Sequence, residues 1–379
     1  MKNTVIFRIG VVALVIGAAG AAAGDFTEPR LGHILAPRRA ECLNGAWLQT
    51  EAANLKHPCT GADGKASYTI EEVKFDPASP TNRWTACTVP RSFYVRNDLV
   101  DIWIKRDIFV RPGDETKRHV IHFEEIGETF AVVVNGHRFD GKPSFHIPQT
   151  VDISGSLKAG TNTVYVMFHK DGVRRQWKDS PIWPQARLGP AMPVHLECQG
   201  EVAVADVITA PQVTSGKVFR AEIVLKNVTA AARKVRVTAG VEGLWTEDAG
   251  EVAVPANGTA SVKVEHPWPE ARLWSPDDPH LYDLDVRVGD LDAFRRRFGF
   301  CEVRVEGPRI LFNGHPVMAR RGGLVKRGSD HSLKAGFAAS RRDGATCARV
   351  FVVDRDAVRI LDAADEAGFF ITPVAAAEA

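Results

Sequence analysis

The sequence predicts a mainly β protein whose last region alternates strands and helices. The chain has 379 residues, of which 45% are hydrophobic and 25% charged, so it can bury a sizeable core in more than one domain. Its 32 Gly and 22 Pro exceed the content typical of a helical bundle. Short Val-rich runs separated by turn residues recur from about residue 67 to residue 305, which favours β-sandwiches.

The first residues have the pattern of a secretory signal. Lys2 and Arg8 precede an apolar run from Ile9 to Ala23, which ends in an Ala-x-Ala cleavage pattern. A membrane anchor is the alternative, but the run is shorter than the roughly 20 residues that span a bilayer. We therefore expect a periplasmic or secreted protein with no membrane span once residues 1–23 are removed.

The charge balance gives no support for a nucleic-acid partner. Lys and Arg number 48 and Asp and Glu number 46, and the resulting net charge of +2 is too small to attract phosphates. Gly136–Pro143 comes close to a phosphate-binding loop, but Pro143 replaces the hydroxyl residue and the context is a hairpin. The 12 histidines show no ligand spacing, so we expect no cofactor and no metal.

Export would permit disulfides among the 6 cysteines. They include no C-x-x-C pair, which argues against a zinc knuckle. A local bridge between Cys42 and Cys59 is one open expectation, since both lie in the same short stretch. Cys301 and Cys347 lie in apolar, strand-like runs, and we expect them to be buried free thiols.

The pattern of residues 24–200 predicts a first β-sandwich. Side chains alternate along Ile102–Ile108, and Asn135-Gly136 between two β-rich runs predicts a tight type I′ hairpin. Further expected strands are His119–Phe123, Phe130–Val134, Phe145–Ile147 and Thr163–His169.

Residues 201–307 have the length and turn spacing of an immunoglobulin-like sandwich. Its expected strands are Val218–Lys226, Lys234–Ala239, Thr259–Glu265 and Leu281–Val288.

In residues 308–379 the pattern changes to an alternation of strands and helices. The expected strands are Ile310–Phe312, Pro316–Ala319, Thr346–Val353 and Phe369–Val374, and the expected helices are Ser332–Arg342 and Asp356–Ala367, the second ended by Gly368. A (β/α)8 barrel takes eight strands and on the order of 250 residues. The region therefore predicts the beginning of an incomplete barrel.

Several motifs follow one another in a fixed order between about residues 83 and 374. They are Asp101–Phe109, Val132–Gly136, Val151–Ile153 with Gly160–Val164, Leu273-Trp274-Ser275-Pro276, Pro279–Tyr282, Arg297–Phe300 and Leu311–Val317. Together they resemble glycoside hydrolase family 2, the group of β-galactosidases, β-glucuronidases and β-mannosidases. No single motif would be enough, but their order makes the resemblance specific.

The resemblance implies a jelly-roll sugar-binding domain, an immunoglobulin-like domain and a catalytic barrel, with a carbohydrate as the partner. It also implies hydrolysis with retention by two glutamates about 5 to 5.5 Å apart. In the family the acid/base follows an Asn at the end of the fourth barrel strand, and the nucleophile ends the seventh. This chain reaches only the third, so no catalytic residue is assigned and the chain alone is expected to be inactive.

Four residues are candidate substrate contacts. Arg349 matches the family's active-site arginine by position, although the His-Tyr-Pro that follows it in the family is absent, and an ion pair with a neighbour such as Asp354 is the alternative. His331 lies near a variable loop of the family, where a surface histidine is the commoner role. Trp177 and Trp183 could stack on sugar rings or pack against the next domain.

Three functions therefore stay open. The chain is the N-terminal part of an exported family 2 glycosidase, a non-catalytic carbohydrate-binding or partner-binding protein, or a purely structural β-sandwich protein. The first predicts an exposed apolar face where the rest of a barrel would pack, and the other two require that face to be covered or polar.

Overall fold

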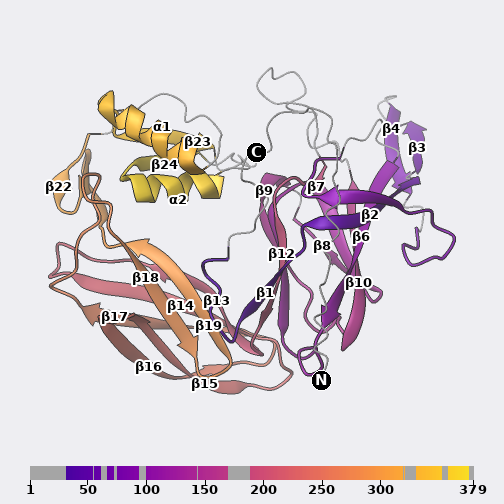
Figure 1. Ribbon diagram of the computed structural model, residues 1–379, viewed down its shortest axis with the longest axis horizontal. Coiled ribbons are helices and arrows are strands. Elements are labelled where there is room, and N and C mark those ends of the chain that lie inside the picture. The colour runs from indigo at the N-terminus through magenta and orange to yellow at the C-terminus, as the bar shows by residue number, and fades with distance from the viewer. Residues whose placement is uncertain are drawn as a thin grey trace, which may run out of the picture.

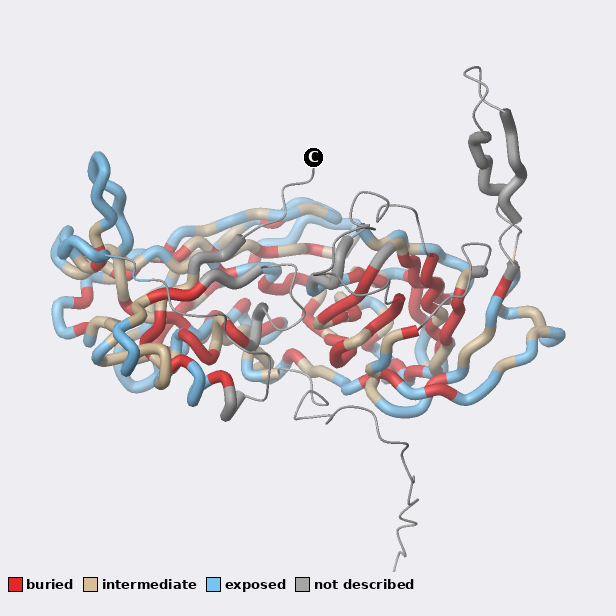
Figure 2. Tube along the Cα trace, turned by 90° about the horizontal axis from the view of Figure 1, so that it is seen from above, coloured by how far each residue is buried: buried red, intermediate tan, exposed pale blue. Residues whose placement is uncertain are grey.

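The computed structural model describes residues 31–53, 55–60, 66–71, 75–93, 100–142, 144–169, 188–318, 320, 330–351 and 357–374. Two β-sandwiches follow one another, and a small unit of helices and parallel strands lies beside the second (Figure 1). Buried positions gather along the inner strands of each unit (Figure 2). The mainly β prediction is confirmed. Within the described residues, no helix has the length and apolarity needed to cross a membrane.

The first sandwich is organised around one long strand, β7 (Arg118–Val134). Its first half pairs with β9, β11 and β12, and its second half pairs with β8 and β10. The other strands are β1 (Arg39–Cys42), β2 (Gly45–Ala53), β5 (Thr85–Val89), β6 (Val100–Val110), β8 (His137–Asp140), β9 (Ser144–Asp152), β10 (Gly160–His169), β11 (Gly189–Pro190) and β12 (Val194–Gln199). A separate antiparallel pair is formed by β3 (Leu55–Thr60) and β4 (Ala66–Glu71).

The structure corrects one expectation in this sandwich and confirms another. The two strands expected at His119–Phe123 and Phe130–Val134 are a single strand, because the register shifts between Phe123 and Glu128 carry β7 from one layer to the other. The type I′ hairpin is confirmed by positive φ angles of 49° at Asn135 and 82° at Gly136. The core between the layers is built around the fully buried rings of Phe123, Phe130 and Phe168.

The second sandwich packs the sheet β13-β14-β17 on the sheet β16-β15-β18-β19. Its strands are β13 (Val202–Thr209), β14 (Val218–Asn227), β15 (Arg233–Val241), β16 (Trp245–Val254), β17 (Thr259–Pro267), β18 (Leu281–Val288) and β19 (Asp292–Gly299). All four expected strands are present, and β13, β16 and β19 are additional. Along β14 every second side chain is buried, so one face of the strand meets a core that includes Phe219 and Phe300.

The last unit begins with a small antiparallel sheet of β20 (Val303–Glu306), β21 (Arg309–Phe312) and β22 (His315–Pro316). The expected strand Ile310–Phe312 therefore belongs to this hairpin and does not pair with the parallel strands. Parallel pairing joins β23 (Cys347–Phe351) to β24 (Phe370–Val374), with α1 (Asp330–Arg342) before β23 and α2 (Ala357–Ala367) between the strands. Gly368 ends α2 with a φ of 65°, as its position predicts.

Trp274 joins this last unit to the second sandwich. Its indole Nε1 donates a 2.8 Å hydrogen bond to the carbonyl of Asp365 in α2. Its ring lies edge-on to Phe312 of β21 and Phe370 of β24, at centroid distances of 5.7 and 5.8 Å. Arg297 of β19 adds a 2.7 Å ion pair to Glu366. The β/α unit is therefore held against the second sandwich by side chains of both.

The cysteines differ in part from expectation. Cys42 is an exposed free thiol, so the local bridge to Cys59 is not formed. Cys301 and Cys347 are free, as expected, but only Cys347 is fully buried and Cys301 is partly exposed.

Candidate functional site

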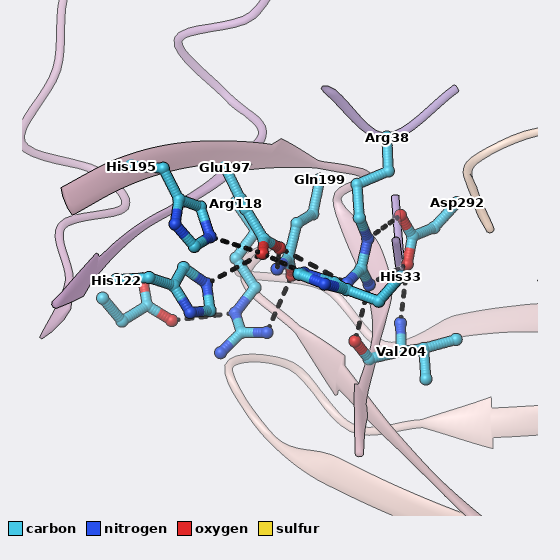
Figure 3. A network of polar contacts seen from close by, with 10 residues as sticks. His33, Arg38, Arg118, His122, His195, Glu197, Gln199, Val204 and Asp292 are labelled. Atoms are coloured by element: carbon cyan, nitrogen blue, oxygen red, sulfur yellow. Dashed lines mark hydrogen bonds and ion pairs between the residues drawn. The ribbon is translucent and has the colours of Figure 1, made fainter. Parts of the chain in front are cut away.

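A polar cluster lies where the two sandwiches meet the segment that precedes β1 (Figure 3). Its centre is Glu197 of β12, whose side chain is 0% exposed. The imidazoles of His33, His122 and His195 surround one of its carboxylate oxygens, and Arg38 and Gln199 contact the other. Buried polar side chains are stable only when each of them has a hydrogen-bond or ion-pair partner.

The period of the strands explains how these side chains come together. His195, Glu197 and Gln199 alternate along β12 and so project from one face, while Leu196 projects into the hydrophobic core. His122 of β7 stands directly opposite His195 in the strand register. The two rings consequently stack at 4.6 Å between centroids, with 4° between their planes.

The distances place three nitrogens around one oxygen. The Nε2 atoms of His33, His122 and His195 lie 2.5, 3.1 and 3.3 Å from Glu197 Oε1. Gln199 Nε2 donates a 2.7 Å hydrogen bond to Glu197 Oε2, and Arg38 Nη1 lies 3.4 Å from the same atom. The two carboxylate oxygens are thus used differently, because Oε1 faces the imidazoles and Oε2 faces the amide and the guanidinium.

Arg38 connects the cluster to the second sandwich. Its Nε and Nη2 donate to the two carboxylate oxygens of Asp292 at 3.0 and 2.6 Å, the forked geometry that makes such pairs strong. Nη2 also donates to the carbonyl of Val204, whose own N–H donates to Asp292 at 2.8 Å. Side chains of Arg38, Glu197 and Asp292 are all at most 2% exposed, so the pairing is a buried one.

Burial and hydrogen bonding act in opposite directions on the acid at the centre. Burial alone would raise the pKa of Glu197, but contacts from His122, His195 and His33 outweigh it and hold that pKa well below its usual range. Burial lowers the pKa of His122, and the contact with Glu197 only partly opposes this effect. The cluster therefore contains an ionised carboxylate at neutral pH, with a neutral imidazole at His122.

A cleft of about 850 Å³ opens beside the cluster. His33 and His122 line it on one side, and side chains of β18, β19, α1 and α2 line the others. Its charged lining residues are Asp283, Arg295, Arg296, Arg297, Lys334, Asp362 and Glu366. The three structural units thus line one open cleft, which gives solvent a route to two of the imidazoles.

Two of the four substrate contacts expected from the sequence lie on described elements, outside the strands that form this cluster. Arg349 lies in β23, in register with Thr372 of β24, and His331 lies in the first turn of α1. Trp177 and Trp183 lie outside the described residues. The roles expected for these residues therefore stay predictions.

The cluster itself was not predicted from the sequence. His33 and Glu197 are 164 positions apart, and no metal or catalytic motif has that spacing. One local signal was available in β12. Every second residue from His195 onward is polar, namely His195, Glu197 and Gln199, so one face of the strand is entirely polar. That pattern indicates a polar contact with another element but does not show which one.

A second feature is an apolar groove of about 220 Å³ between the hairpin sheet and the parallel strands. It is lined by Val303, Ile310, Phe312, Val317, Met318, Cys347, Phe370 and Ile371. Val303 is 63% exposed and Met318 is 76% exposed, unusual values for large apolar side chains gathered in one place. Exposed apolar side chains are therefore present in this region, while their burial by further parts of a barrel stays a prediction.

Comparison with known proteins places this arrangement among the glycosidases. Residues 202–300 match the family model "Glycosyl hydrolases family 2". A β-galactosidase from Leuconostoc mesenteroides is 24% identical over 55% of this chain and 21% of its own length. A putative β-glucuronidase from Formosa agariphila is 23% identical over 75% of this chain and 34% of its own length.

Solved structures agree in fold. A GH2 β-galacturonidase from Eisenbergiella tayi bound to galacturonate superposes with a TM-score of 0.63 at 19% identity, over 89% of this chain and 57% of that one. The β-glucuronidase 2 of Bacteroides uniformis gives a TM-score of 0.63 at 18% identity, over 89% of this chain and 42% of that one. At such identities the likeness establishes the fold alone.

Two sandwiches followed by a β/α unit are thus an arrangement shared with sugar-cleaving enzymes. Residues 202–300 match glycosyl hydrolases family 2, and the matches to its curated and solved relatives support a family 2 relationship for the larger part of the chain. It spans 21% and 34% of the two curated relatives described above.

The charge of Glu197 is expected to stabilise the protein in a pH-dependent way. Because the folded pKa is lowered, the contribution is complete above the unfolded value of about 4.3 and is lost as pH falls below it. Glu197→Gln should therefore lower the free energy of unfolding by about 3 to 5 kcal/mol at pH 7, because it leaves buried partners uncompensated. Urea unfolding of both proteins between pH 8 and pH 3 measures this.

The matched control is Glu265→Gln, which alters a solvent-exposed pair with Arg220 and should cost less than about 1 kcal/mol. The difference between Glu197→Gln and the wild type should shrink as the pH drops below about 4.3. An effect of Glu197→Gln no larger than that of the control, or one independent of pH, would contradict the assignment.

Proposed function

We propose that this chain is the N-terminal part of an exported family 2 glycosidase, which hydrolyses O-glycosidic bonds of β-galactoside-type substrates with retention. The family membership and the names of the relatives support the substrate class, since two of them are a β-galactosidase and a putative β-glucuronidase. In this proposal the two sandwiches support a barrel that residues beyond this chain complete, and the signal at residues 1–23 directs export.

The observation that carries the proposal is the open apolar groove beside β23 and β24. Parallel strands are normally covered on both faces and flanked by further strands, and a pair of them is marginal alone. Within the described residues, β23 and β24 form a sheet of two strands. Beside them the groove exposes Ile310 and Met318, where the remaining strands and helices of a barrel would bury them.

The catalytic carboxylates are expected outside this chain. A retaining glycosidase needs two carboxyl groups at barrel strand ends, about 5 to 5.5 Å apart. Neither β23 nor β24 contains an acidic residue. Glu366 of α2 is bonded to Arg297 and Lys334, which gives it a role in packing the helix against the second sandwich.

Purified protein of residues 24–379 is therefore expected not to hydrolyse nitrophenyl β-galactoside or β-glucuronide. The acid and the nucleophile are each worth orders of magnitude in rate, and in this proposal both lie beyond this chain. Release of nitrophenol is the measurement. Turnover that disappears in Glu366→Gln but persists in the exposed control Glu265→Gln would show that the chain contains its own active site.

The native protein provides a second test, because export and the continuation of the barrel both change its mass. We expect protein from the native host to begin near Gly24 and to exceed the mass of residues 24–379. Intact-mass analysis with terminal sequencing measures both. A cytoplasmic form that retains Met1 and ends at Ala379 would contradict the proposal, and sugar-binding assays would then separate a carbohydrate-binding protein from a structural one.

A further inference from the structure

The polar cluster contains more imidazole nitrogens than its carboxylate can bond. A carboxylate oxygen offers two lone-pair sites, and Glu197 Oε1 already meets His33 and His195. The Nε2 atom of His122 lies 3.1 Å from the same oxygen, so three imidazole nitrogens surround an oxygen that can accept two hydrogen bonds. A cation bound between the carboxylate and two of the imidazoles would relieve this mismatch.

The donor atoms are close enough to share one ion. One ligand atom from each of His33, His195 and Glu197 lies within 4.8 Å of the other two. A tetrahedral zinc ion holds nitrogen and oxygen ligands at about 2.0 to 2.2 Å, which separates them from one another by about 3.3 Å. The observed separations therefore exceed that spacing by at most about 1.5 Å.

The carboxylate is oriented by residues that leave one oxygen for the imidazoles. Gln199 and Arg38 hold Glu197 Oε2, and Arg118 in turn donates a 2.8 Å hydrogen bond to the Gln199 side-chain oxygen (Figure 3). Outer contacts of this kind fix the direction of a ligating carboxylate in metal sites. They make Oε1, rather than Oε2, the atom presented to a cation.

Charge and access favour a divalent cation. Glu197 and Asp292 carry two negative charges against the single positive charge of Arg38, so the buried group is net negative when the imidazoles are neutral. The cleft lined by His33 and His122 gives an ion a path to the cluster. Imidazole together with carboxylate suits zinc and its neighbours in the transition series better than magnesium or calcium.

We propose that His33, His195 and Glu197 form a zinc site between the N-terminal segment and the first sandwich. The protein supplies two nitrogens and one oxygen, and a water molecule would complete the tetrahedral coordination that zinc prefers. The ion fastens the segment around His33 to β12. That segment also contacts the second sandwich, where Arg295 N–H donates a 3.0 Å hydrogen bond to the His33 carbonyl.

The test uses tag-free protein of residues 24–379, freed of metal with a chelator. Calorimetric titration with zinc should show one ion bound per chain, and cobalt should give the visible absorption of a four-coordinate ion. His33→Ala should weaken zinc binding at least tenfold, since it removes one of the three protein ligands. His137→Ala is the control, because His137 is exposed on β8 and lies outside the cluster.

Thermal unfolding gives a readout that does not depend on the folding of a variant. Zinc in excess should raise the melting temperature of the wild type, because an ion that binds only the folded state stabilises it by mass action. Absence of stoichiometric binding, an unchanged melting temperature, or equal affinity in His33→Ala and His137→Ala would each overturn the site. None of these measurements involves glycoside hydrolysis, so the result is separate from the proposed activity.

Discussion

One guanidinium held between two buried carboxylates connects the two sandwiches of this protein. Arg38 meets Asp292 of the second sandwich in a forked pair and Glu197 of the first at 3.4 Å. Buried charges are tolerated only when they are paired, so this arrangement allows one relative position of the two sandwiches. The segment before β1 supplies the arginine, and its path between the sandwiches is therefore part of the same constraint.

The position of the β/α unit follows from that of the second sandwich. Trp274 packs against Phe312 and Phe370 and hydrogen-bonds α2, while Arg297 pairs with Glu366 of the same helix. The motif Leu273-Trp274-Ser275-Pro276, which carried much of the family resemblance, thus lies at this junction. This sequence feature of the family is explained by packing between the two units. An apolar groove lies beside β23 and β24.

The fold was largely predictable because its signals are local. The hairpin at Asn135-Gly136 requires two positive φ angles, which those residues adopt at low cost, and α2 ends at a glycine for the same reason. The continuity of β7 was not predictable, because the polar stretch near Glu125 resembles a turn in sequence but is a bulged part of one strand. Periodicity cannot distinguish these two cases.

The polar cluster could not be predicted from the sequence, for a different reason. Its members come from the segment before β1, from β7, from β12 and from the start of β19, and only tertiary packing brings them together. Alternation along β12 shows that His195 and Glu197 share a face, but the partner of that face is distant in the chain. The candidate contacts Arg349 and His331 came from the family resemblance, and their roles stay predictions.

The central claim is that Arg38 couples the two sandwiches, and differential scanning calorimetry of Arg38→Met tests it most directly. The substitution leaves Asp292 and Glu197 buried without their shared cation, so we expect a large loss of stability, about 3 to 5 kcal/mol, and separate unfolding of the two sandwiches. Arg138→Met, which alters an exposed pair with Asp140, is the control and should leave the transition unchanged. A single transition for Arg38→Met at the wild-type temperature would contradict the account.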